Sequence, residues 1–166
     1  MPFYFAYGSN MNPARVEARI GATRRVLSGV LREHALRFDK ASRIAGISHA
    51  NVVAAPGERV EGALFELLEP EQIECMDPFE GYPHDYDRHR LPIHTAQGAI
   101  EAWVYMAAPG TTGDALRPAR EYLEHLLAGK PFLSADYHAR LSGVEAVHGL
   151  DDETLKALGL SRHSAR

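Results

Sequence analysis

Short apolar runs separated by Gly and Pro, with no crossover helix between them, constrain the fold of this chain most. The runs cover residues 30–39, 52–55, 60–68, 86–94 and 99–106, with Pro56-Gly57 and Gln97-Gly98 at turns between them. Strands joined by short turns pair antiparallel, whereas parallel strands need a crossover of a dozen or more residues. The pattern therefore favours antiparallel hairpins and argues against a doubly wound parallel sheet.

Helical patterns fill most of the remaining sequence. Asn12, Ser134 and Asp151 are suitable N-cap residues, and Pro13 fits the first helical position, where its missing N–H costs nothing. We expect helices over residues 13–20, 69–76, 114–127, 134–141 and 153–158, and a loop rich in helix breakers over residues 77–83. Strands followed by helices are typical of an α+β domain, in which we expect the sheet to be curled.

The length of the chain fits one domain. Its 166 residues can bury one substantial core, and no linker, repeat or low-complexity tract divides them. We therefore expect a single domain over residues 1–160 and a flexible tail over residues 161–166.

Charge and cysteine content narrow the class of protein. The net charge is −4, so the chain lacks the excess of basic residues that is typical of nucleic-acid-binding proteins. Residues 1–40 carry seven Lys and Arg against three Asp and Glu, whereas residues 58–87 carry ten acids and one Arg. The basic third could attract an anionic small molecule or simply solvate helix and strand faces. One Cys excludes an internal disulfide, and no signal peptide or membrane span is evident, so we expect a cytoplasmic protein.

The N-terminal strand ends in a candidate binding loop. The aromatic run Phe3-Tyr4-Phe5-Ala6-Tyr7 is followed directly by Gly8-Ser9-Asn10 and then by the helix start at Asn12. A strand that breaks into Gly-Ser-Asn before a helix presents several backbone N–H groups at one point, where they can hold a carboxylate or an oxyanion. A well-formed strand-to-helix turn without a ligand explains the same residues.

Several common kinds of site have little support. His84, His89 and His94 are spaced by five, which alternates the faces of a strand, and no Cys pair completes a zinc site, so no metal is expected. Cys75 lies in a predicted helix beside Ile73 and Met76, where a small buried hydrophobe is the simpler interpretation. The sequence contains no Gly-x-Ser-x-Gly, no phosphate-binding loop and no Gly-x-Gly-x-x-Gly, so no nucleotide cofactor is expected either.

Glu80 is the strongest candidate for acid–base chemistry. It lies between Phe79 and Gly81-Tyr82. A carboxylate in a partly apolar pocket has a raised pKa and can both take and give a proton near neutral pH. Taken alone, an acid on a surface turn explains the residue as well.

Two segments together resemble the γ-glutamylcyclotransferase superfamily, including its AIG2-like members. They are Tyr7-Gly8-Ser9-Asn10-Met11, where the family has Leu at the position of Met11, and Met76-Asp77-Pro78-Phe79-Glu80-Gly81-Tyr82-Pro83, which is similar to the Glu-Gly loop with the family's catalytic acid. Residues 60–65, 103–106, 118–122 and 129–137 are also similar, so that the resemblance covers about residues 3–142.

The resemblance implies an α+β fold around a small curled β-barrel of mixed or antiparallel strands. It also implies cyclisation of a γ-glutamyl amine or peptide to 5-oxoproline with release of the amine, without a cofactor. Glu80 is then the proton shuttle, and Tyr82 is a further candidate for the pocket wall. The implied substrate-binding residues are Tyr4, Phe5, Ala6, Tyr7, Gly8, Ser9, Asn10, Tyr105 and Tyr122.

Alternatives remain at this point. A related cyclotransferase could remove a γ-glutamyl tag from a larger amine, such as a biosynthetic intermediate or γ-glutamyl-lysine. A non-catalytic module could instead bind a γ-glutamyl or amino-acid ligand with the same loop. We expect a small-molecule partner, no nucleic acid and no membrane, and either a monomer or a homodimer.

Overall fold

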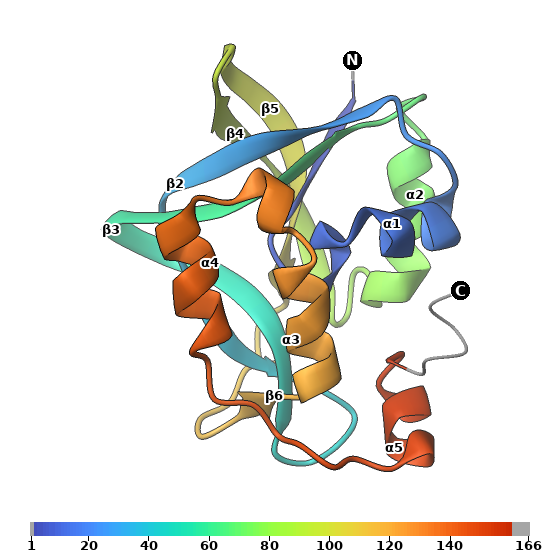
Figure 1. Ribbon diagram of the computed structural model, residues 1–166. Coiled ribbons are helices and arrows are strands. Elements are labelled where there is room, and N and C mark those ends of the chain that lie inside the picture. The colour runs from blue at the N-terminus through green and yellow to red at the C-terminus, as the bar shows by residue number, and fades with distance from the viewer. Residues whose placement is uncertain (1, 161–166) are drawn as a thin grey trace.

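The computed structural model describes residues 2–160, which form an α+β fold (Figure 1). The strands are β1 (Phe3–Ala6), β2 (Arg25–Ala41), β3 (Ile47–Glu66), β4 (Tyr86–Thr95), β5 (Gly98–Ala107) and β6 (Arg117–Pro118). The α-helices are α1 (Pro13–Ile20), α2 (Gln72–Glu80), α3 (Arg120–Leu127), α4 (Ala135–Ser142) and α5 (Asp152–Ala157), and two 3-10 turns are η1 (Ser9–Met11) and η2 (Lys130–Phe132). The predicted tail at 161–166 lies outside the described residues.

Strand β1 closes the sheet into a barrel. The strand order is β1-β5-β4-β2-β3-β6, and β1 also pairs with β3, which returns the sheet to its first strand. The β1–β3 pair is antiparallel with Phe5 opposite Leu64, whereas Tyr4 pairs parallel with Trp103 of β5. Full closure removes exposed sheet edges. The curled barrel of mixed or antiparallel strands that the family resemblance implied is therefore confirmed.

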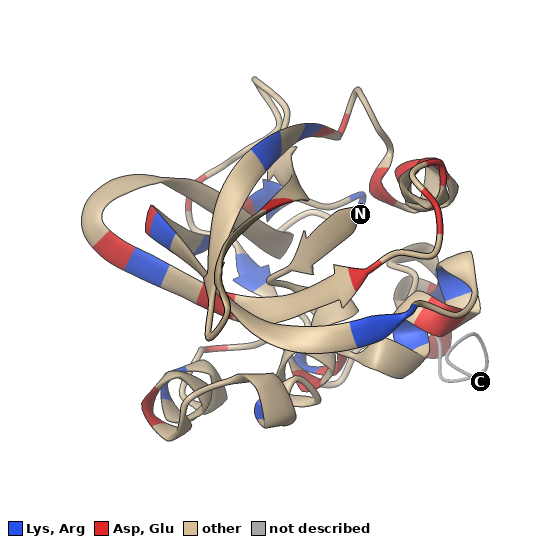
Figure 2. Cartoon of the chain, turned by 90° about the horizontal axis from the view of Figure 1, so that it is seen from above, with Lys and Arg blue, Asp and Glu red and all other residues tan. Residues whose placement is uncertain are grey.

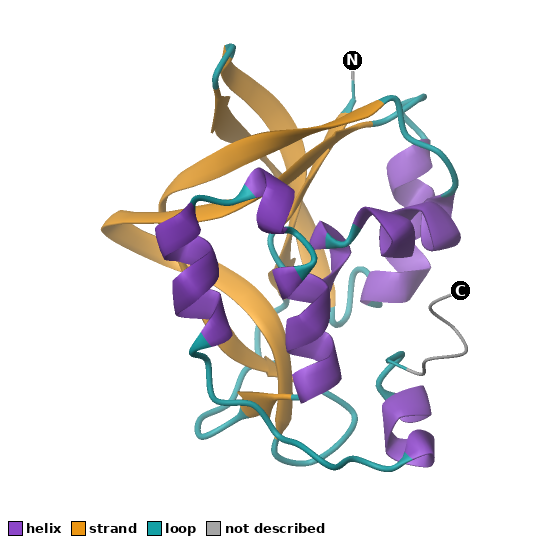
Figure 3. Ribbon diagram, in the orientation of Figure 1, coloured by secondary structure: helices purple, strands orange, loops and turns teal. Residues whose placement is uncertain are grey.

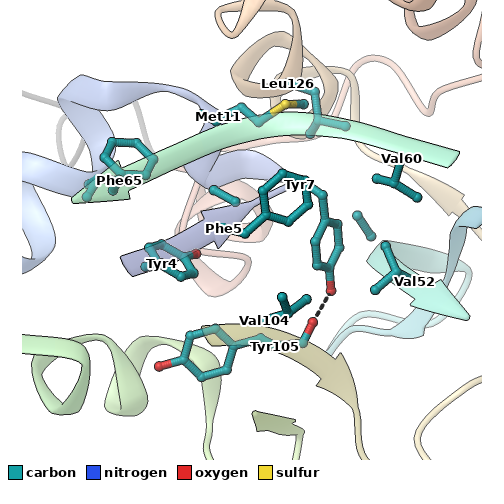
Figure 4. Packing of buried hydrophobic residues seen from close by; sticks show 14 of the residues in the cluster. Tyr4, Phe5, Tyr7, Met11, Val52, Val60, Phe65, Val104, Tyr105 and Leu126 are labelled. Atoms are coloured by element: carbon teal, nitrogen blue, oxygen red, sulfur yellow. Dashed lines mark hydrogen bonds between the residues drawn. The ribbon is translucent and has the colours of Figure 1, made fainter. Parts of the chain in front are cut away.

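The barrel interior is filled by aromatic side chains from β1 and its neighbours (Figure 4). All four residues of β1 are buried, and Phe5 is completely inaccessible. The backbones approach so closely here that a Cβ atom on Gly62 would lie 2.3 Å from the carbonyl oxygen of Ala6. Glycine at position 62 thus permits the β1–β3 contact that closes the barrel.

The helices flank the barrel, with α3 and α4 in front of it and α1 and α2 beside it in the view of Figure 3. Local capping explains where several of them begin. The side chain of Asn12 accepts a hydrogen bond from the N–H of Ala14, that of Ser134 from Tyr137, and that of Asp151 from Thr154. These three N-caps confirm the starts of α1, α4 and α5 expected from the sequence.

Three predicted element boundaries are wrong. Strand β3 continues through Pro56-Gly57, because these residues form an irregularity opposite β2, between the pairs Arg32–Arg59 and His34–Ala54, and not a hairpin turn. Helix α2 continues to Glu80 with Pro78 in its last turn, and the left-handed Gly81 ends it. Residues 114–119 are not helical. Arg117 and Pro118 pair with β3, and helical backbone angles are unfavourable for Arg117 because a proline follows it.

Both basic and acidic residues lie along the strands in Figure 2. Several of them pair across strands, as Arg25 of β2 does with Glu66 of β3 at 2.6 Å and Arg90 of β4 with Glu101 of β5 at 3.7 Å. Some of the basic residues in the N-terminal third thus form ion pairs on the surface of the sheet. No helix within residues 2–160 is long and apolar enough to cross a membrane.

Candidate active site

A small cavity of about 110 Å³ lies where the end of β1 meets the end of α2. Ten of its lining residues are the predicted site residues Tyr4, Phe5, Ala6, Tyr7, Gly8, Ser9, Asn10, Glu80, Tyr105 and Tyr122. The others are Arg15, Arg19, His49, Ala50, Phe79, Tyr86 and Leu158. The fold therefore brings the N-terminal loop and the Glu80 segment to one place, although about seventy residues separate them in the sequence.

The loop after β1, residues 7–10, contacts both the barrel and α3. The hydroxyl of Tyr7 donates a hydrogen bond to the backbone carbonyl of Tyr105 inside the barrel (Figure 4). A Cβ atom on Gly8 would lie 2.9 Å from the hydroxyl of Tyr122, a residue of α3. The loop can approach α3 this closely because position 8 carries no side chain.

Asn10 connects the loop to Glu80. Its Nδ2 donates to Oε1 of Glu80 at 3.2 Å and to the hydroxyl of Tyr4 at 2.9 Å, and its side chain is buried. Its Oδ1 accepts from Nη1 of Arg19 at 3.4 Å. Asn10 thus fixes the Glu80 carboxylate against the cavity wall.

Burial raises the pKa of Glu80 above the ordinary value of 4.5, and the positive charges of Arg19, Arg15 and Lys40 oppose that rise. Glu80 is half-buried, and its side chain lines the cavity. A carboxyl group with a raised pKa and access to a cavity is suited to exchange protons with a bound molecule.

The tyrosines of the cavity are neutral hydrogen-bonding groups. Burial raises the pKa of Tyr122 to about 12, and its hydroxyl accepts from the N–H of Ala50 at 2.9 Å. Tyr86 donates to the carbonyl of the same Ala50 at 2.7 Å. The hydroxyl of Tyr105 donates to Oδ1 of Asp77 at 2.6 Å, so this predicted site residue also ties the cavity wall to α2.

Sequence reasoning missed the basic residues of the site. Arg15 and Arg19 are four apart on α1, which puts both on one helical face next to the loop. Arg15 is 9% exposed, and burial together with Arg19 lowers its pKa to about 10. Burial and the nearby cations also lower the pKa of His49 to about 4, so this histidine is neutral near pH 7. The spacing of Arg15 and Arg19, four residues apart directly after the loop, is the feature of the sequence that could have predicted a basic wall of the site.

Two further expectations are wrong. Tyr82 lies outside the cavity, 37% exposed, with the guanidinium of Arg88 4.7 Å from its ring centre. Cys75 is exposed and not a buried hydrophobe, because Ile73 and Met76 take the inward face of α2. Within residues 2–160, no group of three or more His, Cys, Asp or Glu side chains is arranged to hold a metal ion.

Solved structures share this fold. A γ-glutamyl cyclotransferase is 18% identical, with a TM-score of 0.77 and coverage of 95% of this chain and 98% of that one. The human uncharacterized protein loc79017 is 20% identical, with a TM-score of 0.76 and coverage of 95% and 97%. A yeast γ-glutamyl cyclotransferase specific to glutathione is 12% identical, with a TM-score of 0.59 and coverage of 98% and 97%.

A search of curated protein sequences gave no match. The family described as "Gamma-glutamyl cyclotransferase, AIG2-like" matches residues 4–125, which contain the candidate binding loop, Glu80, Tyr105 and Tyr122. Because this match spans well over half of the 166 residues, the chain belongs to the AIG2-like γ-glutamyl cyclotransferase family.

Proposed function

We propose that this protein cyclises the γ-glutamyl group of a γ-glutamyl amine or peptide to 5-oxoproline and releases the free amine. The observation that carries the proposal is the position of Glu80. Its carboxylate lines the same small cavity as the loop Tyr7–Asn10, and Asn10 at the end of that loop donates to it at 3.2 Å. A group bound in this cavity therefore meets both the hydrogen-bond donors of the loop and an acid–base residue.

The reaction needs no protein nucleophile. The α-amino nitrogen of the substrate attacks the γ-carbonyl carbon and forms the C–N bond of a five-membered lactam, while the original amide C–N bond breaks. Holding both groups in one molecule gives the attack a high effective concentration. The cavity must therefore select a folded conformation of the glutamyl chain, and its volume of about 110 Å³ suits a group of that size better than a large ligand.

Glu80 moves the protons in this proposal. The α-ammonium loses two protons on its way to the lactam N–H, and the departing nitrogen gains two to leave as an ammonium. Glu80 takes one proton from the α-amino group and delivers it to the departing nitrogen, and the second proton of each nitrogen is exchanged with water, before the attack and after the release. Its raised pKa supports this role, because a carboxylate whose pKa lies closer to neutral pH is a stronger base toward the α-amino group, and its protonated form is still acidic enough to protonate the departing amine nitrogen.

Arg15 is suited to hold the α-carboxylate of the substrate. Its guanidinium is buried beside the cavity, and none of the ion pairs within residues 2–160 includes it. A buried cation without an acidic partner gains most from a ligand carboxylate. In this arrangement the loop N–H groups are left to stabilise the oxyanion that develops on the γ-carbonyl.

Release of 5-oxoproline from γ-glutamyl amino acids, glutathione and γ-glutamyl-lysine tests the proposal. The wild type should release 5-oxoproline from at least one of them, whereas Glu80→Gln should fold and release none. Cys75→Ala is the control and should remain active, because Cys75 is exposed outside the cavity. Full activity of Glu80→Gln would falsify the assignment. Binding of these compounds by the wild type without turnover would support a non-catalytic binding module instead.

A further inference from the structure

A second, wider cavity of about 430 Å³ adjoins the first. The two share Arg19, His49, Phe79, Glu80, Tyr86 and Leu158. Glu80 therefore lies at their junction, with the small cavity on one side and the wide cavity on the other. If the γ-glutamyl group fills the small cavity, the departing amine extends into the wide one.

The wide cavity is lined by an excess of positive charge. Arg19, Lys40, Arg43 and Lys156 line it, against the acids Glu80 and Asp85. Nζ of Lys40 lies 3.6 Å from Oδ1 of Asp85, so these two charges largely offset each other. None of the ion pairs within residues 2–160 includes Arg19, Arg43 or Lys156. Three cations thus remain available to a ligand that enters from this side.

One wall of the wide cavity comes from the C-terminal segment, residues 152–160, which lies outside the family match at 4–125. Leu155, Leu158 and Leu160 are buried, which anchors the segment in the core. Nη1 of Arg15 donates to the carbonyl of Gly159 at 3.1 Å and ties the segment to α1. Lys156 is itself exposed and lines the cavity, and it lies between the buried anchors Leu155 and Leu158.

Resting on the proposed function, we propose that the wide cavity is a leaving-amine subsite that selects amines carrying carboxylate groups. Arg19, Arg43 and Lys156 are its specificity-determining residues, and the C-terminal segment completes it. Substrates of the form γ-glutamyl–amino acid, above all those with an acidic second residue, fit this charge. A γ-glutamyl polyamine or a γ-glutamyl lysine side chain in a basic peptide would bring positive charge to three unpaired cations and is disfavoured.

The test compares two substrates that differ in the charge of the departing amine. The substrates are γ-glutamyl-glutamate, whose leaving group carries two carboxylates, and γ-glutamyl-ethylamide, whose leaving group carries none. The variant is the double charge reversal Arg43→Glu with Lys156→Glu. We expect its kcat/KM for γ-glutamyl-glutamate to fall by about tenfold or more, and by at least fivefold more than for γ-glutamyl-ethylamide.

Lys130→Glu is the matched control, because Lys130 is an exposed lysine on η2 that lines neither cavity. It makes the same kind of charge change as the Lys156 substitution, so an effect of net charge alone would appear there too. The wild-type preference for γ-glutamyl-glutamate should also shrink as ionic strength rises. Equal losses with both substrates, or no wild-type preference for the acidic one, would overturn the subsite.

Binding to Glu80→Gln separates this inference from the proposed function. Calorimetry with this variant measures affinity for the two compounds without turnover. Tighter binding of γ-glutamyl-glutamate than of γ-glutamyl-ethylamide, lost in the Arg43 and Lys156 double reversal, supports the subsite even if the wild type releases no 5-oxoproline. Equal binding of both compounds contradicts it, whatever the wild type does in the turnover assay.

Discussion

Asn10 and Glu80, which are seventy positions apart in the sequence, share a hydrogen bond from Nδ2 to Oε1 at 3.2 Å. The same amide nitrogen donates to the Tyr4 hydroxyl at 2.9 Å, so strand β1, the loop after it and the end of α2 meet at one side chain. Asn10 is buried, so its amide depends mainly on these partners within the protein. It therefore acts as a positioning residue for the proposed acid–base group.

Asn10→Ala should lower kcat/KM and move the acid limb of its pH profile to higher pH. A hydrogen bond donated to a carboxylate favours the ionised form and lowers its pKa, so its loss lets burial raise the pKa of Glu80 further. The basic form then appears only at higher pH. We expect a loss of about 10- to 100-fold near neutral pH, typical of a misplaced reacting group.

The control for this prediction is Asn51→Ala. Asn51 is equally buried and donates to Asp39 at 3.1 Å, and none of its side-chain hydrogen bonds within residues 2–160 involves Glu80 or Tyr4. The Asn51→Ala substitution should lower the free energy of unfolding and leave the acid limb of the kcat/KM profile at the wild-type pH. An unshifted acid limb in Asn10→Ala would show that Asn10 does not act through Glu80.

Glu80→Gln should be at least as stable as the wild type near neutral pH. The folded pKa of Glu80 is raised, so between the unfolded and folded pKa values the folded state binds more protons than the unfolded chain. The free energy of unfolding therefore falls as pH rises through this window and stays lower above it. Glutamine removes this loss, and the Tm difference in favour of Glu80→Gln should grow from acidic to neutral pH.

Thermal unfolding at a series of pH values measures this difference. Glu74→Gln, at an exposed position of the same helix, is the matched control. A Glu80→Gln protein that loses stability relative to the wild type as pH rises would contradict the sign argued above.

The sequence predicted those parts of the site that are formed by residues contiguous in the chain. A Gly-Ser-Asn break after an aromatic strand is readable because the loop and its N-cap are contiguous, and Glu80 followed by Gly81 is a short motif. His49 and Leu158 were missed, because they reach the cavity only through tertiary packing of β3 and the C-terminal segment. Leu158 in particular is an ordinary apolar residue at the end of the short helix α5, and nothing in the sequence connects it with the cavity.

The errors in the fold also have physical reasons. Pro78 suggested that the helix ends before Glu80, yet a proline in the last turn of α2 disrupts few helical hydrogen bonds, and Gly81 in the left-handed region supplies the cap. Pro56-Gly57 suggested a hairpin turn, but the partner strand β2 continues on both sides of the irregularity. Local breaker signals were outweighed by pairing that involves distant residues.

Tyr105→Phe should lower the free energy of unfolding by about 1–2 kcal/mol, because the Asp77 carboxylate loses a buried donor. The Tyr105 hydroxyl lies 2.6 Å from Oδ1 of Asp77, and Arg88 also binds this carboxylate through two contacts at 2.9 and 3.1 Å. Arg88 remains in the variant, which limits the loss. Urea denaturation measures the change.

Tyr86→Phe is the comparison for Tyr105→Phe. The Tyr86 hydroxyl donates to a neutral carbonyl, that of Ala50, at 2.7 Å. A bond to a neutral acceptor is weaker than one to a carboxylate, so Tyr86→Phe should cost less. The reverse order would mean that the bond between Tyr105 and Asp77 adds little to stability.

Gly8→Ala should reduce both stability and activity, because the new methyl group would meet two fixed neighbours. The Cβ atom would lie 2.9 Å from the Tyr122 hydroxyl and 3.2 Å from Cβ of Ala50. The hydroxyl cannot move aside freely, since it accepts from the N–H of Ala50 at 2.9 Å. Displacing the loop should cost about 1–3 kcal/mol, the usual range for overpacking, and should lower kcat/KM more than tenfold through misplacement of the substrate group.

Gly143→Ala is the control for this steric argument, because its Cβ atom would find no neighbour nearer than 3.6 Å. It should change the free energy of unfolding by less than about 1 kcal/mol and leave turnover intact. Adding Tyr122→Phe to Gly8→Ala removes the oxygen that the methyl group meets, so the double variant should recover part of the lost stability. A Gly8→Ala protein with wild-type stability and turnover would mean that the loop can shift away from α3 without disturbing the site.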